Sequence, residues 1–188
     1  YDQVRKMAEG AAIMANVDHN VSLISGIHDL LPNRTGGVVM QKNLETLGDI
    51  QYSEEEIMFA LEMQENNGKP KIGIDGKIRP LRETLESPGG GSTDVGDVSY
   101  NVPVVSLAAT TAPKGVPWHS WSVVASSGMS IGHKGMLHAA KALGMTMVDI
   151  FKDENLRKDI KKEFDERIGE YKYDPFLDPG PPPIDYVD

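Results

Sequence analysis

His119 is the residue whose place in the sequence points most clearly to chemistry. It ends a loop rich in proline and glycine, and the only two tryptophans of the chain, Trp118 and Trp121, stand on either side of it. The loop follows an apolar run at residues 102–109 that is typical of a buried strand. Ligands of open α/β sheets collect at such loops, so we expect His119 to lie in a functional site. The alternative is a structural histidine packed between the two tryptophans.

The other four histidines give weaker signals. His133 and His138 are five residues apart on an expected helix, about 140° around its axis, so they cannot bind one metal ion from one face. We interpret both as structural or surface residues; the alternative is that His133, near the start of the helix, approaches an active-site cleft. His19 and His28 lie in or beside an expected strand at residues 17–27.

Polar residues mark the starts of several expected helices. Ser92, Thr93 and Asp94 follow a glycine run and can cap a short helix, whose N-terminus would offer N–H groups to a substrate carboxylate. Asn33 can cap a helix over 34–47, which Gly48 would end. Asp153 can cap the last helix.

Three consecutive glutamates at 54–56 could be mistaken for the carboxylates of a metal centre. Ser53 and Glu56 have the spacing of a capping box, and acidic residues are favoured in the first turn of a helix. We therefore interpret the three glutamates as structural.

Composition restricts the class of protein. The chain has 188 residues and a net charge of −9, which argues against binding to nucleic acid or to an anionic membrane. It has no cysteine, so disulfides and thiolate metal sites are excluded. No apolar run approaches the roughly 20 residues that a membrane-spanning helix needs. These features fit a cytoplasmic protein.

The expected elements alternate between helices and strands. Helices are expected at 3–15, at 34–47, after Ser53, at 130–151 and after Asp153. Strands are expected at 17–27, 102–109 and 122–125, and a small hairpin around Asp75 and Gly76. We therefore predict an α/β fold with a mixed sheet flanked by helices. Exposed sheet edges would favour dimerisation.

Two motifs carry a family resemblance. The sequences STDVGDVS at 92–99 and GVPWHSW at 115–121 resemble the C-terminal half of p-aminobenzoyl-glutamate hydrolases. These enzymes belong to the dinuclear metal amidohydrolase and peptidase family of aminoacylases, hippurate hydrolases and carboxypeptidase G. The resemblance implies the C-terminal part of a mixed-sheet, phosphorylase/hydrolase-like catalytic domain with helices on both faces, together with the end of an inserted lid domain. It divides the chain into a lid or dimerisation part at 1–32, a catalytic part at 33–173 and a proline-rich tail at 174–188.

The same resemblance implies a reaction and its residues. The reaction would be hydrolysis of the amide of an N-acyl or N-aroyl amino acid such as p-aminobenzoyl-glutamate, in a homodimer with two divalent ions, zinc or manganese, per chain. His119 would be a metal ligand, and a substrate-binding role would fall to Asn33, Ser92, Thr93 and Asp94. Asp97 would hold its loop in place instead of binding metal. A lid histidine would stabilise the oxyanion, and neither His19 nor His28 can be aligned to it.

The chain begins with Tyr1 inside an expected helix, and the family's other ligands and its catalytic glutamate are absent from it. We therefore expect a fragment of a longer enzyme that is inactive alone, with no catalytic residue of its own. The alternative is a non-catalytic interaction or regulatory module that keeps the fold.

Overall fold

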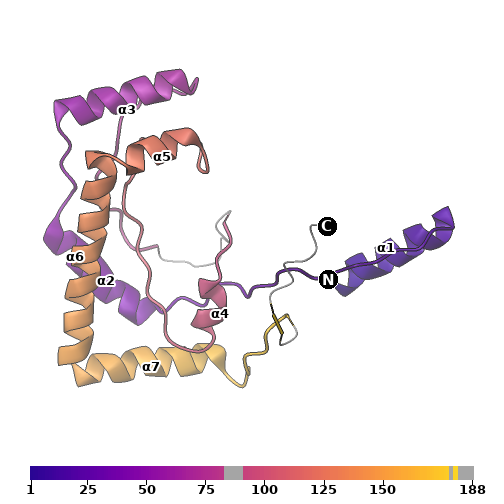
Figure 1. Ribbon diagram of the computed structural model, residues 1–188. Helices are drawn as coiled ribbons and strands as arrows, with labels where there is room; N and C mark the ends of the chain where they lie inside the picture. Colours follow the sequence, from indigo (N-terminus) through magenta and orange to yellow (C-terminus); the bar gives the residue numbers. More distant parts are fainter. Residues whose placement is uncertain (83–90, 178–179, 182–188) are drawn as a thin grey trace.

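The computed structural model describes residues 1–82, 91–177 and 180–181. Seven helices are present in these residues (Figure 1). They are α1 (Asp2–Ala15), α2 (Arg34–Leu47), α3 (Glu54–Asn66), α4 (Val95–Ser99), α5 (Trp121–Ser127), α6 (Ser130–Lys152) and α7 (Glu154–Ile168). The glycines at 89 and 90 and most of the proline-rich tail lie outside the described residues.

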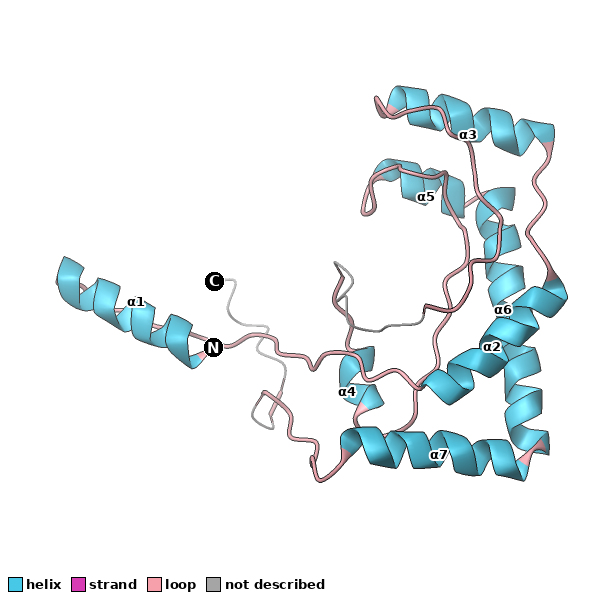
Figure 2. Ribbon diagram, turned by 180° about the vertical axis from the view of Figure 1, so that it is seen from behind, coloured by secondary structure: helices cyan, strands magenta, loops and turns pink. Residues whose placement is uncertain are grey.

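The prediction of an α/β fold with a mixed sheet is wrong, because the described residues form helices and no sheet (Figure 2). The apolar run at 102–109 forms no strand, and its one β-bridge to other described backbone is an isolated parallel bridge between Pro32 and Val104. There the Asn33 N–H donates to the Val104 carbonyl at 3.0 Å. Pro32 and Pro103 have no N–H to donate, so the pairing cannot continue through them into a ladder.

The other predicted strands are also absent from the described residues. Residues 17–27 form no strand. The stretch at 122–125 belongs to α5, in which Ser122 and Ser126 are both fully buried four residues apart, the spacing of a helix face. Around Asp75 and Gly76 the Gly76 carbonyl accepts from Ile50 N–H at 3.0 Å, so this turn contacts the segment before α3 instead of forming a hairpin.

The helix starts that depend on local side chains are confirmed. Asn33 Oδ1 accepts from Gly36 N–H at 2.9 Å at the start of α2. Ser53 and Glu56 form the complete capping box of α3. Asp153 accepts from the N–H groups of the two residues that follow Glu154 at the start of α7. Gly48 follows the last residue of α2 with a positive φ of 75°, which a residue without Cβ adopts at little cost.

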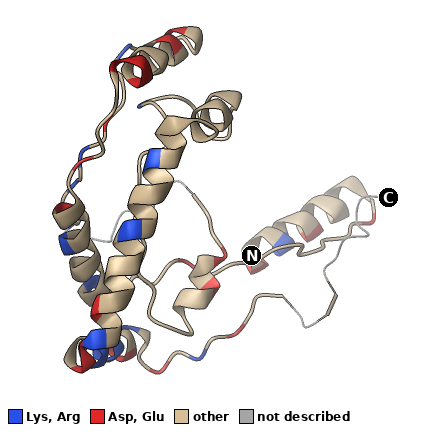
Figure 3. Ribbon diagram, turned by 60° about the vertical axis from the view of Figure 1, so that its left-hand side comes forward, with Lys and Arg blue, Asp and Glu red and all other residues tan. Residues whose placement is uncertain are grey.

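Helices α2, α6 and α7 pack together and form the core of the molecule. Met40 of α2, Ala142 of α6, and Ile160 and Phe164 of α7 are buried there. Polar contacts fix the same packing, since Asn43 Nδ2 donates to Thr146 Oγ1 at 3.0 Å and to Asp149 Oδ2 at 2.9 Å. Helix α7 carries charges of both signs (Figure 3), and ion pairs four residues apart join them, such as Lys158 with Glu154.

Helices α3 and α5 lie near the N-terminal end of α6, away from α7 (Figure 1). Glu56 of α3 is buried, and its Oε2 lies 2.6 Å from Lys134 Nζ of α6. Ser122 Oγ of α5 donates to Asn67 Oδ1, the residue after α3, at 2.9 Å. These contacts hold α3 against α6 and α5 against the end of α3. The loop containing His119 leads directly into α5.

Helix α1 extends away from the other helices (Figures 1 and 2). It ends at Asn16, which adopts the left-handed conformation with φ 54°, a conformation that asparagine tolerates. Apolar side chains such as Met7, Ile13 and Met14 are exposed along it. Among the described helices, none has the length and apolarity needed to cross a lipid bilayer.

Candidate functional site

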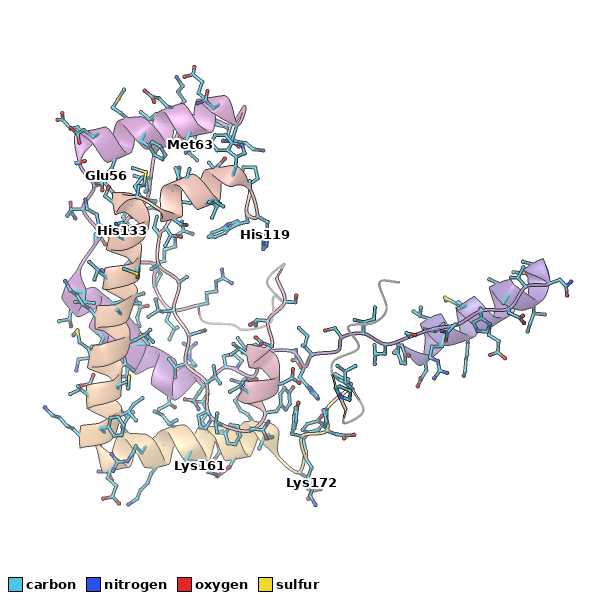
Figure 4. All side chains as sticks on the ribbon, viewed as in Figure 1. Glu56, Met63, His119, His133, Lys161 and Lys172 are labelled. Carbon is cyan, nitrogen blue, oxygen red and sulfur yellow. The ribbon has the colours of Figure 1, made fainter. Side chains whose placement is uncertain are left out.

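His119 lies in the turn that leads into α5, on the inner side of the helical frame (Figure 4). Its φ is 59°, a left-handed conformation that is uncommon for a residue other than glycine. Ser120 Oγ donates to the Pro117 carbonyl at 2.6 Å and closes the turn around it. The imidazole is exposed and forms no hydrogen bond with the described residues.

The tryptophans do not bury His119. Trp118 is 70% exposed and Trp121 is 58% exposed. Among the described residues the ring contacts of histidine all belong to His28. The alternative of a structural histidine packed between two tryptophans is therefore wrong, and an exposed imidazole without a partner can accept a ligand.

A buried glutamine fixes the path of the chain just before this turn. Gln64 of α3 is fully buried, and its Nε2 donates to the carbonyls of Gly73 and Lys114 at 2.8 and 2.7 Å. Its Oε1 accepts from the N–H groups of Ile72 and Gly73, both at 2.9 Å. One amide thus joins α3, residues 72–73 and the beginning of the His119 loop. The sequence does not reveal this role, because nothing local distinguishes Gln64 from an exposed glutamine on a helix.

The residues described do not by themselves fit a dinuclear metal centre. Within residues 1–82, 91–177 and 180–181, no three histidine or carboxylate side chains lie close enough to hold a metal ion. A catalytic zinc site normally uses three protein ligands, and His119 supplies one nitrogen. Its role as a metal ligand stays a prediction.

The predicted substrate-binding residues do not gather around His119. Ser92, Thr93 and Asp94 precede α4, which lies near α7, whereas His119 precedes α5 at the other end of the frame (Figures 1 and 4). All three are exposed. The short helix predicted after them is present, and Thr93 Oγ1 accepts from Val95 N–H at 3.3 Å.

Asn33 is 5% exposed, and its side chain is fully engaged within the fold. Besides capping α2, its Nδ2 donates to the Ile160 carbonyl of α7 at 2.9 Å. The amide therefore joins α2 to α7. Its function as an N-cap is confirmed, while a contact with substrate stays a prediction.

A second histidine is surrounded by aromatic rings. His28 is 8% exposed, and its Nδ1 donates to Asp97 Oδ1 at 2.8 Å, while its Nε2 lies 2.7 Å from the Tyr171 hydroxyl. Its ring stacks on Phe176 with a centroid distance of 4.3 Å and lies 5.0 Å from the Tyr100 ring. We call these five residues the His28 cluster.

The His28 cluster joins three separate parts of the chain: the segment before α2, helix α4 and the segment after α7. Asp97 also accepts from the Tyr173 hydroxyl at 3.2 Å. The hydrogen bond from His28 lowers the pKa of Asp97, and that from Tyr173 acts in the same direction. The prediction that Asp97 holds its loop in place agrees with these contacts. A Cβ on Gly96 would collide with the His28 carbonyl, so a glycine is needed where α4 meets this segment.

The sequence does not reveal the His28 cluster as a unit. From the sequence, His28 is a candidate for the lid only. The closely spaced aromatic residues Tyr171, Tyr173 and Phe176 are the one available signal that this segment packs against the fold.

The buried carboxylate of Glu56 shows the strongest electrostatic perturbation near α5. Burial alone would raise its pKa, but hydrogen bonds from Lys134, Ser130 and the Ser53 N–H, with the positive charge of Lys134, lower the pKa to about 2. Glu56 is therefore ionised and committed to α3 and α6, as expected of a structural residue.

Comparison with known proteins gives one informative similarity. The sequence matches no family profile, and no solved structure matches it. The chain is 34% identical to one of the subunits of p-aminobenzoyl-glutamate hydrolase from Escherichia coli (strain K12). The alignment covers 87% of this chain and 39% of that protein, so the chain spans about two fifths of the length of its relative. The resemblance expected from the motifs at 92–99 and 115–121 is confirmed: over most of its own length, this chain is similar to part of a p-aminobenzoyl-glutamate hydrolase.

Proposed function

We propose that this chain is part of a metal-dependent amidohydrolase that cleaves the amide of an N-acyl or N-aroyl amino acid such as p-aminobenzoyl-glutamate. The observation that carries the proposal is the 34% identity to a p-aminobenzoyl-glutamate hydrolase over 87% of the chain. Because the chain spans 39% of that relative, the activity, substrate and partners of the whole protein all belong to the proposal.

In this proposal His119 contributes one ligand to a centre of two divalent ions, zinc or manganese. Its exposed imidazole and the absence of a hydrogen-bond partner among the described residues support this role. A centre of that kind needs more ligands than one histidine, so the others would come from outside the described residues. The general base would come from there as well, and this chain alone would be inactive.

The predicted substrate contacts of Asn33, Ser92, Thr93 and Asp94 belong to the same proposal. The exposed polar groups before α4 support it more than Asn33 does, because the Asn33 amide already makes two hydrogen bonds within the fold. The separation of α1 from the other helices supports a distinct lid part at the start of the chain, whereas the contacts of His28 join the end of residues 1–32 to α4 and to the segment after α7; the boundary at residue 32 belongs to the proposal. The name of the relative describes it as one subunit of its enzyme, which supports an assembly of several chains; a homodimer and a cytoplasmic location are further parts of the proposal.

The test is a chimera. The segment of the E. coli protein that aligns with this chain is replaced by the chain, and release of p-aminobenzoate from p-aminobenzoyl-glutamate is measured with zinc or manganese. We expect hydrolysis by the chimera and none by the isolated chain. A chimera that folds and assembles like the E. coli protein but does not hydrolyse the amide would contradict the proposed function.

A further inference from the structure

A cavity of about 540 Å³ lies between α2, residues 75–82 and residues 106–116. Its volume falls in the range of about 300–1,000 Å³ that is usual for small-molecule sites. Apolar side chains of Met40 and Leu44 from α2 and Val116 from the loop line part of it, and His138 of α6 also reaches it. Trp118, next to His119, belongs to its lining and is mostly exposed, so an aromatic face is available at this site.

The charges around the cavity have the opposite sign to the protein. Its lining contains four cations, Lys77, Arg79, Arg82 and Lys114, and one carboxylate, Asp75, which leaves an excess of three positive charges. The chain as a whole has a net charge of −9. A local excess of positive charge in an acidic protein attracts anions to that place in particular.

The single carboxylate of the lining, Asp75, pairs with one of the four cations. Asp75 accepts from Lys77 N–H at 3.0 Å and from Arg79 Nη2 at 3.3 Å. The first of these bonds lowers its pKa most, and the positive charges of Arg79 and Lys114 act in the same direction. Within the part of the chain that the structure describes, no carboxylate forms an ion pair with Lys77 or Lys114.

The walls that carry these cations are fixed by hydrogen bonds. Gln64 holds the Lys114 carbonyl, and Lys114 N–H donates to the Gly73 carbonyl at 3.2 Å. Thr110 Oγ1 donates to the Asp75 carbonyl at 2.7 Å, which ties the two wall segments together. The cavity is therefore held open in part before any ligand binds, which reduces the entropy cost of binding.

We propose that this cavity binds the carboxylate groups of a small anionic molecule, with Lys77 and Lys114 as the cationic partners and Trp118 against its aromatic or acyl group. The proposal rests on the proposed function for the class of ligand, an N-aroyl amino acid. It assigns substrate recognition to residues beside the His119 loop, in addition to the residues before α4.

The experiment measures equilibrium binding by isothermal titration calorimetry to the 188-residue chain, with a chelator present. N-benzoyl-L-glutamate is the dianionic probe, benzamide the neutral probe and inorganic phosphate the probe for unspecific attraction of anions. We expect N-benzoyl-L-glutamate to bind most tightly and its affinity to fall as salt is added. No measurable binding of it, or equal binding of benzamide or phosphate, would overturn the proposal.

A double variant, Lys77→Gln with Lys114→Gln, removes two cations of the cavity. We expect its Kd for N-benzoyl-L-glutamate to rise about tenfold or more. The matched control, Lys158→Gln, removes an exposed cation of α7 and should change Kd less than about twofold. Circular dichroism confirms that both variants fold; wild-type affinity in a folded double variant would overturn the proposal. The binding assay contains no metal ion and measures no hydrolysis. A negative result in it can therefore be distinguished from a negative result with the chimera.

Discussion

His28 lies inside a cluster of aromatic rings, whereas His119 lies at an exposed turn before α5. Both ring nitrogens of His28 are used, one by the Asp97 carboxylate and one by the Tyr171 hydroxyl. Neither nitrogen of His119 forms a hydrogen bond with the described residues. The same side chain thus serves packing in one region and is free to bind a ligand in the other.

The difference shows what decides the function of a histidine. A ring nitrogen that already has a hydrogen-bond partner must lose it before it can bind a metal ion or substrate. His28 instead forms hydrogen bonds with residues that lie 69 and 143 positions after it in the sequence. The residue type alone makes both histidines candidates for a chemical role. Their surroundings in the fold show which one has a ring nitrogen free of hydrogen bonds with the described residues.

Substitution of the two histidines should give the largest contrast in stability. His28→Ala removes a buried ring, leaves the Tyr171 hydroxyl without its partner and leaves Asp97 with the Tyr173 hydroxyl alone. We therefore expect the free energy of unfolding to fall by about 2–4 kcal/mol. His119→Ala should change it by no more than about 0.5 kcal/mol, since the side chain is exposed. Urea unfolding followed by circular dichroism measures both. Equal losses in the two variants would contradict the comparison.

The buried Glu56 and its exposed neighbour Glu55 extend the comparison to carboxylates. Glu56→Gln weakens the hydrogen bonds to Lys134 and the Ser53 N–H, and we expect a loss of about 1–3 kcal/mol near pH 7. Glu55→Gln, the matched control, should cost less than about 0.5 kcal/mol.

The pH dependence of the Glu56 contribution follows from the lowered pKa. The pKa falls from 4.5 to about 2 on folding, so the stabilisation is fully present above pH 4.5 and is lost as pH falls toward 2. Unfolding curves of wild type and Glu56→Gln should therefore converge over this range. A difference that stays constant with pH would show that the Glu56 carboxylate is not ionised in the fold as we describe.

Two tyrosine hydroxyls should give the smallest effects. The Tyr52 hydroxyl is buried and has no hydrogen-bond partner among the described residues; burial, followed by the charges of Glu56 and Asp75, raises its pKa to about 12. Tyr52→Phe should leave the free energy of unfolding unchanged or raise it by up to about 1 kcal/mol. Tyr171→Phe, which removes the partner of His28 Nε2, should lower it by about 1–2 kcal/mol. A larger loss for Tyr52→Phe than for Tyr171→Phe would be inconsistent with these contacts.

Features that depend on residues close in sequence were predictable. The caps at Asn33, Ser53 and Asp153 act over two or three residues, and all three are present in the structure. The motifs at 92–99 and 115–121 also pointed to the relative that the comparison finds.

Features that depend on distant partners were not predictable. An apolar run such as 102–109 fits a strand, but a sheet also needs a second strand beside it, and the described residues offer one bridge to Pro32. A four-residue run such as 122–125 fits a helix as well as a strand. The Gln64 contacts and the His28 cluster join segments that no local pattern connects.

The central claim is that His119 is the residue through which this chain takes part in amide hydrolysis, and the chimera tests it most directly. We would compare kcat/KM for p-aminobenzoyl-glutamate in the chimera with His119→Ala and with His133→Ala, another exposed histidine. The account predicts a loss of at least about 100-fold for His119→Ala and a change of less than about threefold for His133→Ala. Wild-type kcat/KM in a folded His119→Ala chimera would contradict it.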